Sequence, residues 1–259
     1  MLDSKKYFAL SIAGFDPCGG AGVLADIKTF EANNVYGLGV CSSITFQNDN
    51  TFVGLEWLSF ENIINQLDPL FDKYVIDVVK IGLIESLDVF AKLISYLKGK
   101  NKDIKIIWDP ILKASAGFQF HTDVKKDLLN SISENIHLIT PNWPEAQNLF
   151  GTTDKSFLKN QVACAIYLKG GHASYSSALD CLFDKNTEFH FESAWIEKGE
   201  KHGSGCVLSA AIAANIAKKQ SLNEACKNAK SYVSLFLAST ENLLGFHFGN
   251  QSHKSVSMF

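Results

Sequence analysis

The chain has 259 residues, of which 46% are hydrophobic and 20% charged, and its formal net charge is −3 at pH 7. This is the composition of an ordinary globular protein, and it gives no electrostatic reason to expect a nucleic acid or an anionic membrane as a partner. No uninterrupted apolar run approaches the roughly 20 residues that a bilayer span needs. Residues 1–7 lack the apolar core of a signal peptide, so we expect a cytoplasmic protein.

The six cysteines are scattered along the chain and form no CxxC pair. This spacing argues against a zinc site, and a disulfide framework is not expected in a cytoplasmic chain of this length. The cysteines other than Cys206 are therefore expected to be small buried fillers.

In chain order, short apolar runs alternate with amphipathic stretches. Residues 7–13 predict a buried strand, and apolar residues three and four apart predict a helix over 21–33. The same patterns predict further strands within 35–46 and at 75–81, 104–108, 136–140 and 163–168. Further helices are predicted at 60–74, at 86–97 with Ser86 as its cap, near 124–132, and from Pro144. A hairpin over 179–183 and 188–191, then helices from about Gly205 and Leu222, complete the chain.

This alternation predicts an α/β fold with a central, mostly parallel sheet and helices on both faces. We expect one domain over residues 1–250 and a loose tail over 251–259. In such sheets ligands bind at the carboxyl ends of the strands. Polar or glycine-rich motifs follow six of the predicted strands, so we expect them to meet at one rim: Gly14–Gly22, Gln47-Asn48, Gly82, Asp109-Pro110, Pro141-Asn142 and Gly170-Gly171-His172.

The most informative segment, residues 201–214, begins as a glycine-rich turn and becomes a strong helix former. Gly203 and Gly205, on either side of Ser204, allow a tight turn. The unpaired N–H groups and the dipole of the helix that follows favour a bound phosphate. Cys206 falls in the first helical turn, where its thiol could take a proton from an alcohol that attacks ATP. The helix end lowers the pKa of such a thiol and nearby phosphate raises it, and the sequence leaves that balance open.

Two residues are candidates for contacts with a substrate. Asp26, one turn into the first predicted helix, could accept a hydrogen bond from a ligand, or could be an exposed helix carboxylate. Gln47 offers both a donor and an acceptor, which suits the edge of a heteroaromatic ring, although a polar loop residue is the plain alternative. The loop of residues 14–22 has neither the dinucleotide-binding glycine spacing nor the Gly-Lys-Ser/Thr of a phosphate-binding loop.

Other candidates suit the phosphate and metal side of a site. Asp109 and Glu145 could hold Mg²⁺, and Glu145 could equally be a simple charge at a helix end. Asn142 could donate a hydrogen bond to phosphate. Lys169 could meet phosphate from beside the Gly170-Gly171 pair, or could be a solvated lysine.

Together these motifs resemble the hydroxymethylpyrimidine/phosphomethylpyrimidine kinases of thiamine biosynthesis, members of the ribokinase-like superfamily. The resemblance runs from Leu10 to about Ala238 and includes a cysteine where sugar kinases of the superfamily carry aspartate. It rests on Ala13–Asp26, Gln47-Asn48, Lys80–Gly82, Asp109-Pro110, Thr140–Glu145, Lys169–His172 and His202–Ile212. It implies a three-layer ribokinase-like fold and ATP- and Mg²⁺-dependent phosphorylation of 4-amino-5-hydroxymethyl-2-methylpyrimidine. In many members the monophosphate is then phosphorylated as well.

The resemblance also implies roles for individual residues and a homodimer. Cys206 would be the catalytic base, beside an anion hole of Gly203, Ser204 and Gly205. The pyrimidine pocket would be lined by Gly14, Asp26, Gln47, Leu83 and Ile111. The nucleotide would be bound by Asn142, Lys169 and Gly171, and the metal by Asp109 and Glu145.

Some residues depart from the family pattern. Phe15 and Cys18 stand where small hydroxyl residues are usual, Leu83 replaces a common methionine, and Ser115 occupies the place of a common lysine. Pyridoxal or pyridoxine is therefore an alternative substrate. Outside the kinases, the alternatives are a hydrolase with Cys206 as nucleophile and His202 as base, or a pyrimidine sensor without turnover.

Overall fold

The strands form one mixed sheet, which in the described residues has the order β3-β2-β1-β4-β5-β6-β7-β8-β9. The computed structural model describes residues 7–111, 126–152, 154, 158, 162–170 and 177–249. The mutually parallel strands are β1 (Phe8–Phe15), β2 (Tyr36–Gln47), β4 (Val78–Ile81), β5 (Lys105–Trp108), β6 (Leu138–Ile139) and β7 (Ala165–Leu168). Antiparallel strands extend the two sides: β3 (Phe52–Trp57) beside β2, and β8 (Ser177–Asp184) and β9 (Thr187–Ala194) beyond β7.

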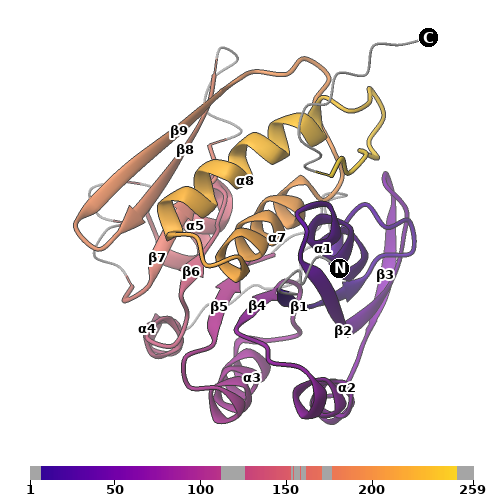
Figure 1. Ribbon diagram of the computed structural model, residues 1–259, viewed down its shortest axis with the longest axis vertical. Coiled ribbons are helices and arrows are strands. Elements are labelled where there is room, and N and C mark those ends of the chain that lie inside the picture. Colours follow the sequence, from indigo (N-terminus) through magenta and orange to yellow (C-terminus); the bar gives the residue numbers. More distant parts are fainter. Residues whose placement is uncertain are drawn as a thin grey trace, which may run out of the picture.

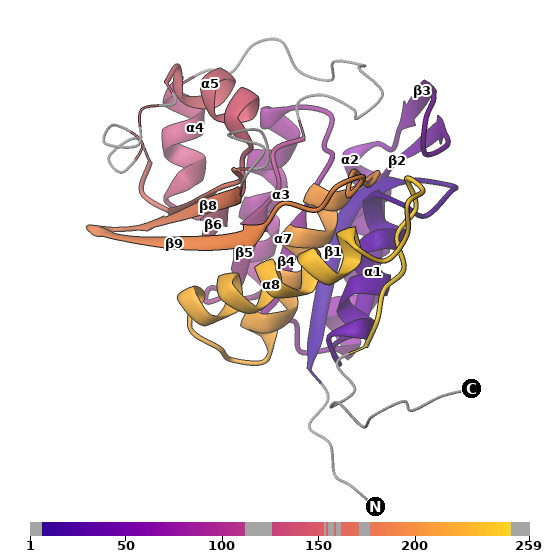
Figure 2. The ribbon, with the colours of Figure 1, turned by 90° about the horizontal axis from the view of Figure 1, so that it is seen from above.

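Helices cover both faces of the sheet, which confirms the predicted three layers (Figure 1 and Figure 2). One layer contains α1 (Gly22–Ala32), α7 (Ser204–Ala217) and α8 (Leu222–Leu237), and the other contains α2 (Phe60–Lys73), α3 (Leu87–Lys100), α4 (Lys126–Ser133) and α5 (Trp143–Phe150). Side chains of a strand alternate between faces, so Leu10 and Ile12 of β1 pack toward the second layer while Ala9 packs toward the first.

Helix α7 is the centre of its layer. It is apolar on nearly its whole circumference, and its residues from Cys206 to Ala217 are buried between the sheet and α8. This explains why its sequence is a run of alanines and aliphatic residues rather than an amphipathic pattern. The packing fixes the amino-terminal end of α7 against the sheet.

The predicted order of strands and helices is confirmed, and the Ser86 side chain caps α3 by accepting a hydrogen bond from the Val89 N–H at 3.2 Å. Strand β3 was not predicted; it is a half-exposed partner of β2 and carries Gly54 and Glu56, so its apolar alternation is weak. Strand β4 begins three residues later than predicted because Val75, 79% exposed, lies outside the sheet. The predicted tail, residues 251–259, falls outside the described residues.

Among the described residues, no helix combines the length and apolar character that a bilayer crossing requires.

Candidate active site

The amino-terminal end of α7 meets the carboxyl ends of the parallel strands. A Cβ atom added to Gly205 would lie 3.3 Å from Lys169 Nζ and 4.0 Å from Asp109 Oδ2, and these residues follow β7 and β5. The Gly203 N-cap has a φ of +75°, and a Cβ there would lie 2.1 Å from the Gly20 carbonyl oxygen in the loop after β1. Only glycine meets both conditions. Motifs from three strand ends are therefore in contact at one rim, as the sequence predicted.

Lys169 lies between two buried carboxylates on this rim. Its Nζ is 2.9 Å from Asp109 Oδ1 and 3.5 Å from Glu145 Oε2. Burial opposes the charge of each group, but Lys169 and then Lys80 hold the pKa of Asp109 below its usual range, and the two carboxylates raise the pKa of Lys169. For Glu145 burial wins and raises the pKa. Ser209, which sequence reasoning missed, donates to Asp109 Oδ2 at 3.2 Å from the second turn of α7.

Asn142 and Glu145 form the capping box of α5. Asn142 Oδ1 accepts from the Glu145 N–H at 2.9 Å, and Glu145 Oε2 accepts from the Asn142 N–H at 2.8 Å. Glu145 therefore caps the start of α5, as the helix-end alternative predicted, in addition to facing Lys169. Among the described residues the Asn142 NH₂ group has no acceptor, so it could donate to a ligand.

The donor chemistry of this rim fits Mg²⁺. Asp109 and Glu145 supply carboxylate oxygens, the ligand type that Mg²⁺ prefers. Two carboxylates face the single ammonium of Lys169, so a negative charge remains uncompensated within this group when both acids are ionised. Asp109 and Glu145 are the described residues that would hold the ion.

Lys80 and Asp26 form a fully buried ion pair beneath the rim. Lys80 Nζ lies 3.0 and 2.8 Å from the two carboxylate oxygens, both side chains are 0% exposed, and the Ser11 hydroxyl donates to Asp26 as well. Burial raises the pKa of Asp26, and the Lys80 ammonium opposes that rise. Asp26 is therefore not the exposed helix carboxylate that was the alternative. Lys80 had a signal in the sequence, since a lysine inside a short apolar strand needs a buried partner.

Contacts connect the residues predicted for the pyrimidine pocket, and Gln47 reaches them through Thr45, whose Cγ2 would lie 3.5 Å from a Cβ on Gly14. A Cβ on Gly14 would meet Leu83 Cδ2 at 3.2 Å, and one on Gly82 would meet Ile111 Cδ1 at 3.7 Å and Lys80 Nζ at 3.0 Å. Gly14, Leu83, Ile111 and the buried pair are thus brought together. Gln47 ends β2 and donates from Nε2 to Thr45 Oγ1 at 2.9 Å. Gly171 lies outside the described residues, as do His172 and Ser115.

Burial decides the state of the Cys206 thiol in the ligand-free protein. Desolvation raises its pKa to about 12, and the carboxylates of Asp109 and Asp26 act in the same direction. The Lys80 ammonium and a backbone hydrogen bond from Gly22 oppose this rise. The balance that the sequence left open therefore favours a protonated thiol.

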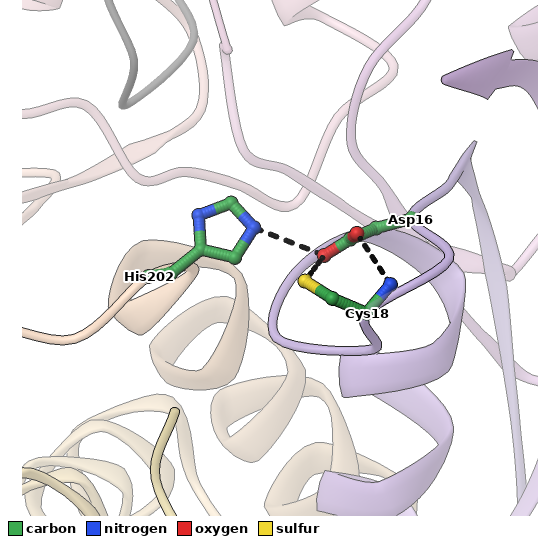
Figure 3. Close-up of side chains that lie close together, drawn as sticks. All are labelled: Asp16, Cys18 and His202. Atoms are coloured by element: carbon green, nitrogen blue, oxygen red, sulfur yellow. Dashed lines mark hydrogen bonds and ion pairs between the residues drawn. The ribbon is translucent and has the colours of Figure 1, made fainter. Parts of the chain in front are cut away.

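Asp16 and His202 join the glycine loop to the turn before α7 (Figure 3). His202 Nε2 lies 2.9 Å from Asp16 Oδ2, and the same carboxylate accepts from the Ala21 N–H and from Cys18. Burial alone would raise the pKa of Asp16, but the hydrogen bonds from His202, Cys18 and Ala21 lower it to about 2. Sequence spacing did not indicate this contact, because the two residues are 186 positions apart.

The lowered pKa of Asp16 predicts a pH-dependent contribution to stability. An acid whose pKa is lower in the folded state stabilises the fold above its unfolded pKa, about 4, and loses that effect as the pH falls toward the folded value. Asp16→Asn should therefore lower the urea midpoint above about pH 4, and the difference from wild type should shrink as the pH falls from about 4 toward about 2. Urea titrations of both proteins across this range measure it, and a constant difference would contradict the assignment.

Solved structures define the class of the protein. The ADP complex of Bacillus subtilis pyridoxal kinase matches with a TM-score of 0.77 and 28% identity, over 90% of this chain and 92% of that one. A phosphomethylpyrimidine kinase from Clostridium difficile matches with a TM-score of 0.73 and 29% identity, over 88% of this chain and 98% of that one. The three-layer fold is that of a small-molecule kinase with a ribokinase-like fold.

The sequence comparison narrows the class to one family. The family described as phosphomethylpyrimidine kinase matches residues 16–251. A hydroxymethylpyrimidine/phosphomethylpyrimidine kinase of Staphylococcus aureus is 33% identical over 251 residues, which cover 92% of this chain and 91% of that enzyme. The chain belongs to the phosphomethylpyrimidine kinase family.

Proposed function

We propose that the protein transfers the terminal phosphoryl group of ATP to the hydroxymethyl group of 4-amino-5-hydroxymethyl-2-methylpyrimidine, and then phosphorylates the monophosphate. One observation supports the reaction type: the glycine turn at the start of α7 lies beside the Lys169 ammonium and Asp109. A Cβ atom added to Gly205 would be 3.3 Å from Lys169 Nζ. The names of the relatives support the substrate. The proposal includes a single domain over residues 1–250, a homodimer and a cytoplasmic location.

The residues of the rim divide the work of phosphoryl transfer, in which positioning and charge neutralisation supply most of the rate. The first N–H groups of α7, at Ser204, Gly205 and Cys206, would bind an anion with the helix dipole behind them, and the Ser204 N–H donates to the Lys201 carbonyl at 3.3 Å in the ligand-free protein. Lys169 adds a positive charge, and Asn142 and Gly171 are proposed to bind the nucleotide with it. Mg²⁺ held by Asp109 and Glu145 would neutralise phosphate charge.

Cys206 is proposed as the base for the attacking alcohol. Its thiol carries a proton in the ligand-free protein, so the role requires that the thiolate form while substrates are bound. The Lys80 ammonium favours that ionisation. No described hydrogen bond supports the hydrolase alternative: His202 Nε2 bonds to Asp16, and its Nδ1 has no partner among the described residues.

An ATP-consumption assay tests the function directly. The panel contains the thiamine pyrimidine, its monophosphate, pyridoxal and pyridoxine, because the likeness to the Bacillus subtilis pyridoxal kinase makes the B6 vitamers the second candidate. We expect the highest kcat/KM for the pyrimidine and measurable turnover of its monophosphate. A preference for pyridoxal or pyridoxine would overturn the substrate, and no turnover with any of the four would overturn the kinase.

Gln47→Ala tests the predicted pyrimidine pocket. The variant removes the amide that would read the ring edge, and it leaves the nucleotide side, built from other strand ends, unchanged. We expect weaker binding of the pyrimidine and unchanged binding of ATP, both measured by titration calorimetry. Gln66→Ala is the matched control, because this amide bonds the backbone of Cys41 from α2. Equal pyrimidine affinity in wild type and Gln47→Ala would show that Gln47 does not bind the pyrimidine.

A further inference from the structure

Three side chains with metal-binding atoms converge where the glycine loop meets the turn before α7 (Figure 3). His202 Nε2 is 2.9 Å and Cys18 Sγ is 3.2 Å from the same oxygen, Oδ2 of Asp16. All three ligand atoms lie within 4.8 Å of one another. We propose that Asp16, Cys18 and His202 form a binding site for Zn²⁺ or another thiophilic divalent cation such as Cd²⁺, separate from the Mg²⁺ carboxylates Asp109 and Glu145.

The donor set matches this class of ion. A thiolate, an imidazole nitrogen and a carboxylate oxygen are the ligands that bind Zn²⁺ with bonds of about 2.0–2.3 Å. Tetrahedral angles at such bond lengths place donor atoms roughly 3.3–3.7 Å apart. The two measured separations from Oδ2, 2.9 and 3.2 Å, reach this spacing after small side-chain movements. The three protein ligands leave the fourth position to water.

The side chains are already held in place. Asp16 is 1% exposed and accepts hydrogen bonds from two backbone N–H groups, those of Cys18 and Ala21, which fix its carboxylate. His202 is 7% exposed, and its ring lies so close to Gly20 that a Cβ there would be 2.6 Å from His202 Cδ2. Cys18 is only partly buried and follows the exposed Pro17, so an ion can enter the site from the side of the Cys18 thiol.

The charges and protons of this site also balance when a divalent cation binds. Burial, followed by the Asp16 carboxylate, raises the pKa of the Cys18 thiol to about 11, so the free site holds a thiol proton. Coordination releases that proton to solvent, and the imidazole proton moves from Nε2 to Nδ1. Nδ1 has no hydrogen bond to lose among the described residues. The thiolate and the carboxylate then carry two negative charges against one divalent cation.

A second cluster, on the β8–β9 hairpin, has a geometry that is less suitable for binding a cation. Cys181 Sγ lies 3.8 Å from His190 Nδ1, whereas Glu188 Oε1 lies 3.1 Å from Nε2 of the same ring. One imidazole cannot direct both nitrogens at one ion. Cys181 is therefore the matched control for Cys18.

The test uses the full chain without a histidine tag and does not depend on kinase activity. Cd²⁺ is titrated into wild type, Cys18→Ser and Cys181→Ser while the ultraviolet thiolate-to-Cd²⁺ absorption band is recorded. Zn²⁺ competition and proton release are measured in the same samples. Cys18→Ser keeps a hydroxyl donor toward Asp16, so we expect it to fold normally and to retain its activity.

We expect one equivalent of Cd²⁺ per chain in wild type and in Cys181→Ser, displaced by Zn²⁺, with about one proton released per ion. Cys18→Ser should lack the absorption band and should bind at least about tenfold more weakly. Loss of the band in Cys181→Ser with retention in Cys18→Ser would place the site on the hairpin and overturn the proposal. A band absent from wild type would overturn it as well.

Discussion

Lys80→Met should lower the free energy of unfolding by about 3–5 kcal/mol, because it leaves the Asp26 carboxylate buried without its partner charge. Both side chains are 0% exposed, and their atoms approach to 2.8 Å. The Ser11 hydroxyl remains as a donor but supplies no charge. Urea unfolding of the variant and of wild type measures the loss.

The cause of this loss can be separated from lost packing by two further measurements. Without Lys80 the pKa of the buried Asp26 should rise further. The variant should therefore be more destabilised at about pH 8 than at about pH 5. Adding Asp26→Asn to Lys80→Met should recover part of the stability, because the unpaired charge is removed. Lys219→Met, which breaks the half-exposed pair with Asp77, is the control and should change the midpoint little. An equal loss at both pH values, with no recovery in the double variant, would contradict the charge explanation.

The buried pair also shows what the sequence reveals about the site and what it does not. Residues that follow a strand or begin a helix can be assigned to the rim, because parallel strands end on the same side of a sheet. Gly203, Gly205, Asp109 and Lys169 were predicted in this way, and the structure brings them together. Their proposed roles toward ATP and Mg²⁺ remain predictions.

Contacts between distant segments were beyond the reach of this reasoning. Lys80 and Asp26 are 54 positions apart, and Asp16 and His202 are 186 apart. Only the packing of α1 and α7 against the sheet brings these partners together. Strand β3 was missed for a related reason: it depends on pairing with β2, and its own residues are half-exposed.

The protonation state of Cys206 is a further property that the sequence left open. The helix position of the thiol was predicted, and by itself it lowers a thiol pKa. The depth of burial and the two nearby carboxylates, which depend on the tertiary structure, raise the pKa to about 12 instead. The electrostatic state of a residue is therefore harder to predict than its position.

Cys206→Ala should reduce turnover by roughly 10²–10⁴-fold, the usual effect of removing a general base. ATP affinity, measured by calorimetry, should change little, since the backbone N–H groups of the turn and Lys169 remain. Cys226→Ala is the matched control: it also removes a buried thiol from a helix, and it lies in the apolar cluster between α7 and α8. That variant should keep near-normal turnover.

The pH dependence of kcat separates a base from a merely structural thiol. Because the thiolate is the reactive form and the ligand-free pKa is about 12, wild-type kcat should rise with pH through the neutral and mildly alkaline range. In Cys206→Ala this rise should disappear together with the rate. If the variant lost rate but kept the same pH profile, the thiol would serve to position the α7 turn, and another group would take the proton. Near-normal turnover in Cys206→Ala would exclude both roles, and the rate would then depend on the anion hole and its charges.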